Sequence, residues 1–106
     1  MQVAFTGKGV LSGVNVSDNG RVFITNKTAG VVYSQGQGVL MAKIGTATFT
    51  FQVIGHYGAD GKLRDIDTVF HPKAIGNLAF LGNTVAIVKD EIDKTGNAIT
   101  KFWVLK

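Results

Sequence analysis

Hydrophobic and polar residues alternate most regularly between Thr46 and Tyr57. The apolar face carries Ala47, Phe49, Phe51, Val53 and Tyr57, and the polar face carries Thr46, Thr48, Thr50, Gln52 and His56. Because side chains alternate across a β-strand with period two, this pattern predicts a half-buried antiparallel strand. Asp60 and Gly61, which follow it, predict a hairpin turn.

The same alternation and similar turn signals extend along the rest of the chain. The expected strands cover residues 1–5, 10–16, 21–26, 31–43, 46–57, 62–71, 84–92 and 98–105. Turns are expected at 17–20, 27–30 and 93–97, the first because Asn19 and Gly20 readily adopt positive φ. Since nearly every connection is short, neighbouring strands should be antiparallel. The prediction is a small all-β, antiparallel up-and-down β-barrel of about 7–8 strands, with a β-sandwich as the alternative.

Two glycines interrupt the strand predicted at residues 31–43. Gly36 and Gly38 share a face with Ser34 and Ala42. A glycine inside a strand marks a bend or the close approach of another backbone or a ligand. We therefore expect strong curvature at this strand, with room for a ligand as the alternative.

The segment 73–83 breaks the alternation. Pro72 is expected to end the preceding strand because proline cannot donate a hydrogen bond to a sheet. Gly76 and Gly82 permit sharp reversals, so the segment predicts a compact loop or single helical turn that plugs one end of the barrel. The apolar side chains expected to fill the core there are Leu78, Phe80 and Leu81.

Composition agrees with one folded domain covering residues 1–106. The chain is 45% hydrophobic and 17% charged, and it contains no cysteine, which excludes disulfides and thiolate metal sites. No apolar run is long enough to span a membrane, and no signal peptide is visible at the N-terminus. We therefore expect a cytoplasmic protein with no membrane partner.

The net charge is +4 at pH 7. The basic residues are spread along the chain, many of them beside turns, and no stacking-aromatic motif accompanies them in the sequence. This distribution is typical of solvated loop edges and predicts no nucleic-acid partner.

Three stretches resemble one protein family: Tyr33–Met41, Gly76–Asn83 and the C-terminal residues 102–106. Together with the sequence between them, they are similar to a family of small prokaryotic proteins of uncharacterised function. The resemblance implies an all-β chain and supplies no catalytic residues. Members of that family begin further upstream, which implies an additional N-terminal strand and, without it, a sheet edge that a homo-oligomer would pair.

Polar residues on two predicted strands suggest a binding site. The predicted ligand-binding residues are Tyr33, Gln35, Gln37, Asp65 and Asp67, which would converge on a small polar cavity if both faces were interior. A barrel of about eight strands can just hold one small ligand. The high apolar content favours a small apolar ligand in the barrel interior or mouth, without a cofactor.

Two other classes of function remain open from the sequence. One is a barrel-type isomerase or cyclase that uses Asp65, Asp67 or Glu91 as acid–base groups, with Tyr33 or His56 assisting and Asp90 as a further acid. The other is a homo-oligomeric structural protein without catalysis.

The two histidines, His56 and His71, lie fifteen residues apart in the sequence, near opposite ends of a predicted hairpin. They are expected to be isolated surface or rim residues rather than ligands of one metal.

Overall fold

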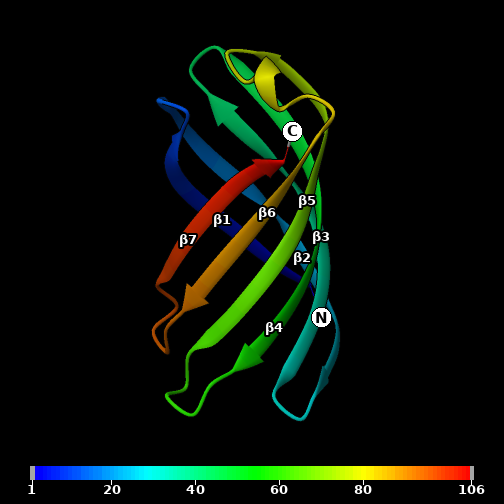
Figure 1. Ribbon diagram of the computed structural model, residues 1–106, viewed down its shortest axis with the longest axis vertical. Helices are drawn as coiled ribbons and strands as arrows, with labels where there is room; N and C mark the ends of the chain where they lie inside the picture. Colours follow the sequence, from blue (N-terminus) through cyan, green and yellow to red (C-terminus); the bar gives the residue numbers. More distant parts are fainter. Residues whose placement is uncertain (1, 106) are drawn as a thin grey trace.

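Seven antiparallel β-strands follow one another between residues 2 and 105 and form a single sheet (Figure 1). The computed structural model describes residues 2–105, with the side chains of residues 26–28 excepted. Met1, the start of the first predicted strand, lies outside the described residues. The elements are β1 Gln2–Leu11, β2 Val14–Thr28, β3 Val31–Ala42, β4 Gly45–Tyr57, β5 Leu63–Gly76, the 3₁₀ turn η1 Ala79–Leu81, β6 Thr84–Ile92 and β7 Ala98–Leu105. The predicted all-β up-and-down fold is confirmed.

The sheet curls into a half-barrel. β1 and β7 stand at the two ends of the pairing order, and each is paired with one neighbouring strand. Figure 1 shows that the curl carries β6 and β7 in front of β1 and β2. One curled sheet therefore provides both walls of the core, in place of the two packed sheets of a sandwich.

Three phenylalanine rings fill the inner side of the curl. The ring centroid of Phe5 lies 6.3 Å from that of Phe49 and 5.8 Å from that of Phe51. The rings of Phe49 and Phe51 cover Gly38 and Gly36, and a Cβ added to either glycine would lie 2.5 Å from the ring above it. The glycines thus let the aromatic rings pack directly on the backbone, which permits the tight coil of the sheet.

The segment after β5 closes one end of the core, as predicted, but only two of its three large apolar side chains are buried there. Leu78 and Leu81 are 0% exposed and belong to the core cluster, whereas Phe80 is 45% exposed. The backbone N–H of Leu81 donates to the carbonyl of Leu78 at 3.0 Å, which closes the single turn of η1. The predicted plug is confirmed for the two leucines and is wrong for Phe80.

No helix between residues 2 and 105 has the length and apolar character needed to cross a membrane.

Pro72 lies inside β5 and does not end it. The pairing between β4 and β5 shifts register between Thr48 and Thr50 and skips Pro72, while the pairing of β5 with β6 stops at His71. The missing N–H of the proline is therefore needed by neither neighbouring strand. β5 continues to Gly76, so the strand end predicted at residue 71 is wrong.

Asn19 and Gly20 lie within β2, where a turn was predicted. Gly20 stands opposite Phe5 in β1, and a Cβ at Gly20 would clash with the Phe5 ring. The first hairpin turn is instead made by Ser12 and Gly13, whose φ angles are 48° and 79°. The glycine of this Asn-Gly pair supplies space for a ring rather than a turn. The strand predicted at residues 10–16 is divided by the turn at Ser12 and Gly13, and its second part joins the strand predicted at residues 21–26 in β2.

Leu81→Ala should lower the free energy of unfolding by about 2–5 kcal/mol, because it empties a fully buried site. Phe80→Ala, one position earlier in the same turn, should lower it by less than about 1 kcal/mol, because its ring is largely in solvent. Urea denaturation of both variants provides the comparison. Equal losses in the two variants would show that η1 does not pack on the core through its leucines.

Candidate functional site

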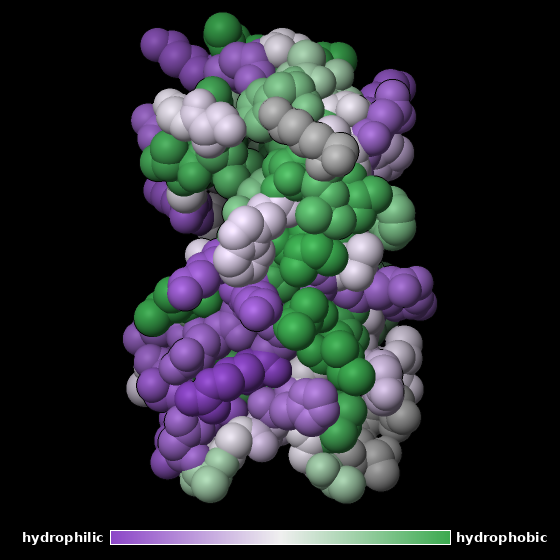
Figure 2. All heavy atoms as spheres, in the orientation of Figure 1, coloured by the Kyte–Doolittle hydropathy of each residue, from purple (hydrophilic) through white to green (hydrophobic). Residues whose placement is uncertain are grey.

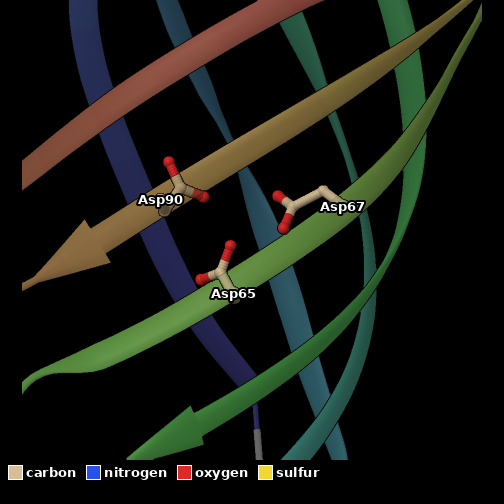
Figure 3. A group of neighbouring side chains, drawn as sticks. All are labelled: Asp65, Asp67 and Asp90. Carbon is tan, nitrogen blue, oxygen red and sulfur yellow. The ribbon is translucent and has the colours of Figure 1, made fainter. Parts of the chain in front are cut away.

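Two aspartates of β5 and one of β6 meet on the inner side of the sheet (Figure 3). Asp65 stands directly opposite Asp90 in the register between the two strands, and Asp67 follows two residues further along β5. Each carboxylate offers one oxygen to a group whose members lie within 4.8 Å of one another. Three acidic side chains from two adjacent strands therefore share one small volume.

A fourth aspartate reaches the interior from the other half of the sheet. Asp18 belongs to β2; burial raises its pKa, and the negative charge of Asp90 raises that pKa further. β2 and β6 are not neighbours in the sheet, so this interaction crosses the inside of the curl. Four of the seven acidic residues of the chain thus contribute to one interior.

These carboxylates have few hydrogen-bond partners. The hydroxyl of Thr100 donates to Oδ1 of Asp90 at 2.5 Å. The Oδ1 atoms of Asp18, Asp65 and Asp67 are buried and accept no hydrogen bond within the described residues. The ion pairs found between residues 2 and 105 all lie elsewhere. Because an unpaired buried carboxylate is costly, the cluster must take up protons or a cation.

Burial and the proximity of the three carboxyl groups change the acidity of Asp65 and Asp67 strongly. Burial raises the pKa of Asp65 to about 10, and the neighbouring carboxyl groups of Asp67 and Asp90 raise it further, because they can share the bound proton and because of their negative charges. Burial also raises the pKa of Asp67 to about 6, although the hydrogen bond with Asp65 acts in the opposite direction. Asp65 therefore holds a proton at neutral pH. Carboxyl groups whose pKa values differ in this way place a proton donor beside a proton acceptor.

The structure separates the five predicted ligand-binding residues into two groups. Asp65 and Asp67 face the interior, whereas Tyr33, Gln35 and Gln37 are exposed on the outer face of β3. The predicted convergence of all five on one cavity is therefore wrong. The glycine-bearing face of β3 turns inward because the rings of β4 pack on it, and this sends the tyrosine and both glutamines outward.

The other predicted acid–base residues also lie outside the cluster. His56 is exposed and stands opposite Arg64 in the register between β4 and β5. Glu91 lies 3.0 Å from Nζ of Lys62 and 3.7 Å from the guanidinium of Arg64, in an ion-pair group near the β4–β5 turn. Figure 2 shows hydrophilic side chains gathered over the lower ends of β5, β6 and β7. Both residues therefore lie on the outer surface, and Glu91 has basic partners there.

His71 is buried rather than on the surface or the rim. Its side chain is 1% exposed, its ring lies edge-on to Phe102 at 6.0 Å, and its Nδ1 lies 3.3 Å from the hydroxyl of Thr84. Burial lowers its pKa, against a smaller opposing effect of a hydrogen bond with the backbone of Thr84. The prediction of an exposed position is wrong for His71 and correct for His56.

The outer face carries a shallow groove of about 330 Å3. We call it the outer groove. Two exposed aromatic residues, Phe23 and Phe70, take part in its lining, and three glutamines supply amides between β3 and β4. The polar side chains that line the outer groove are Gln35, Gln37, Thr50 and Gln52.

The sequence indicates that Asp90 faces inward, because the period-two alternation along β6 places it on the apolar face of that strand. Ala86 and Val88 precede Asp90 on the buried face of β6. A carboxylate that continues a buried apolar face is unusual and marks a special environment. Asp18 could not be recognised in this way, because the expected turn at residues 17–20 concealed its strand.

The protein should become less stable as the pH rises from about 5 to about 8. Asp65 and Asp67 bind protons more tightly in the folded protein than in the unfolded chain, where carboxyls titrate near pH 4, so raising the pH favours unfolding. The lowered pKa of His71 works in the opposite direction, but only below about pH 6.5. Asp65→Asn should remove most of this dependence and add roughly 1–3 kcal/mol of stability at the higher pH.

Urea denaturation at both pH values measures the effect, with Asp60→Asn as the control. Asp60 is exposed, and its hydrogen bond with Arg64 lowers its pKa, so this variant should keep the decline with pH. An equal stability of the native protein at the two pH values would contradict the assignment of a tightly held proton to the cluster.

Comparison with protein-family models, with curated proteins and with solved structures gives no match to this chain. The chemistry of its own side chains is therefore the basis for assigning a function.

Proposed function

We propose that the half-barrel is a binding module for a hard divalent cation of the Ca²⁺ type, with Asp65, Asp67 and Asp90 as its ligands. The observation that carries this proposal is the meeting of three carboxylates from two adjacent strands, with oxygens within 4.8 Å of one another. Carboxylate oxygens are the ligands that such cations prefer in proteins.

Ca²⁺ suits the cluster because it accepts irregular arrangements of oxygen ligands, whereas Mg²⁺ demands a nearly ideal octahedron. Calcium binds oxygen at 2.3–2.6 Å, so two of its ligands can stand up to about 5 Å apart. Magnesium binds oxygen at 2.0–2.1 Å, which limits that separation to about 4 Å. The oxygens of the cluster lie within 4.8 Å of one another, which is inside the separation that Ca²⁺ allows.

The surroundings of Asp65 supply independent support. This side chain is 8% exposed, its Oδ1 has no hydrogen-bond partner among the described residues, and it points toward Asp67 and Asp90 (Figure 3). A cation in the cluster would provide the missing partner and offset the cost of burying the charge. Asp18 adds a fourth carboxyl group from the opposite half of the sheet.

A small apolar ligand in the interior stays a prediction from the sequence. Phe5, Phe49 and Phe51 occupy part of the interior, and carboxylates line another part. This combination favours a cation over an apolar molecule as the occupant of the acidic part. Self-association and a cytoplasmic location also stay predictions.

Acid–base catalysis at the same cluster is a second candidate function. It is favoured by the separation of the pKa values of Asp65 and Asp67, which provides a proton donor and a proton acceptor side by side. Tyr33, His56 and Glu91 take no part in such a site, since they lie on the outer face. Under this alternative the cluster would act in its protonated form, and added Ca²⁺ would not stabilise the protein.

Calcium should raise the melting temperature of the native protein near neutral pH. At a free Ca²⁺ concentration about 100 times the dissociation constant, binding adds about 2.7 kcal/mol, which corresponds to several degrees or more in a domain of this size. Circular dichroism melts in excess EDTA and in millimolar CaCl₂ provide the measurement. Asp90→Asn should abolish the shift.

Glu91→Gln is the matched control, because Glu91 is the next residue of β6 and belongs to the outer ion-pair group. This variant should keep the calcium-dependent shift. The proposal fails if the native protein melts at the same temperature with and without calcium, or if both variants respond alike.

A further inference from the structure

The inward placement of aspartates leaves the outer surface more basic than the net charge suggests. Four of the seven acidic residues belong to the interior, so three remain outside it against eleven basic residues in the chain. Two of these three, Asp60 and Glu91, already form ion pairs with Lys62 or Arg64. An outer surface of this kind attracts polyanions.

Aromatic side chains gather on the same outer surface. The strand register places Phe23, Gln35, Gln52, Thr68, Ile87 and Trp103 in one row across β2 to β7. Phe23 and Trp103 are exposed at the two ends of this row, about 24 Å apart when the path is followed along the curled sheet at ~4.8 Å per strand. Phe70 is exposed in the next row and lines the outer groove with Phe23.

Basic residues lie beside these rings. Arg21 neighbours Gln37 in the register between β2 and β3 and is exposed. Nζ of Lys89 lies 6.0 Å from the centroid of the Trp103 ring, and Lys101 stands opposite Lys89 in β7. None of the three takes part in an ion pair within the described part of the chain.

We infer that this outer face binds single-stranded nucleic acid. Unpaired bases stack on the exposed rings of Phe23, Phe70 and Trp103, as on other sheet surfaces with exposed aromatic residues. The amides of Gln35 and Gln37 both donate and accept, so they suit the edges of bases. The backbone phosphates lie toward the basic residues beside the rings.

The charge distribution distinguishes this ligand from the alternatives. A neutral oligosaccharide could also stack on aromatic rings and bond to amides, but it would gain nothing from the basic residues beside the groove. A duplex offers phosphates but keeps its bases stacked and unavailable to the rings. The sequence-based expectation of no nucleic-acid partner rested on the lack of a stacking motif, and the sheet assembles such a surface from residues distant in the chain.

Fluorescence anisotropy with an end-labelled oligo(dT) of about 20 nucleotides, at low salt, tests the inference. We expect saturable binding that weakens as salt rises. Phe70→Ala should weaken it at least about fivefold, because one stacked base contributes about 1–3 kcal/mol. Far-UV circular dichroism and a thermal melt establish that the variant folds.

Further variants test whether the groove and the basic residues beside it contact the oligonucleotide. Gln35→Glu preserves the shape of an exposed side chain while placing a negative charge in the groove, so it should weaken binding without affecting the fold. Arg21→Gln should weaken binding more than Lys43→Gln, which removes an equal charge from the exposed turn between β3 and β4.

Several outcomes would overturn the inference. They are no binding at low salt, equal affinity for a duplex of the same length, equal effects of Arg21→Gln and Lys43→Gln, or displacement of the oligonucleotide by a neutral oligosaccharide. Since the outer groove and the interior cluster lie on opposite faces, a failure here leaves the calcium experiment unaffected.

Discussion

The packing of aromatic rings on glycines is the interaction on which the rest of this structure depends. Phe49 and Phe51 of β4 lie on Gly38 and Gly36 of β3, and Phe5 of β1 lies on Gly20 of β2, so aromatic rings occupy the space that a Cβ would take at each glycine. The sheet coils tightly there and separates an inner face from an outer one. Every other assignment, including which polar residues are buried, follows from that separation.

The interior that results is divided between two kinds of chemistry. One part is apolar and stabilises the fold by removing large side chains from water. Another part holds carboxylates whose burial is unfavourable unless protons or a cation neutralise them. Proteins retain such clusters at functional sites at a cost in stability, and here the aromatic core and the leucines of η1 are available to offset that cost.

Local sequence patterns predicted most of the strands correctly. They gave wrong assignments where the conformation of a residue depends on contacts with distant parts of the chain. The alternation from Thr46 to Tyr57 identified β4 and its buried face because one face of that strand is packed and the other is solvated. Asn19 and Gly20 were misassigned because a glycine that makes room for a distant ring looks the same in sequence as one that makes a turn. Pro72 was misassigned because the bulge that accommodates it also involves β4.

The same limit applies to the candidate site. Asp65 and Asp67 were recognisable as a pair because they lie two residues apart on one strand. Whether Gln35 and Gln37 joined them depended on which face of β3 turned inward, and that was decided by the rings of the neighbouring strand.

The alternation of side chains along β3 and β4 also means that the outer groove can be altered by mutation without altering the inner face. Gly36 and Phe51 support the core, while Gln35, Gln37 and Gln52 stand on the opposite side of the same backbone segments. A residue of the groove can therefore be replaced without emptying a site in the core, because successive side chains never share a face. The aspartates are likewise separated from the groove by the thickness of the sheet. Cation binding inside and polyanion binding outside can thus coexist in one small domain, each surface opposite in charge to its partner.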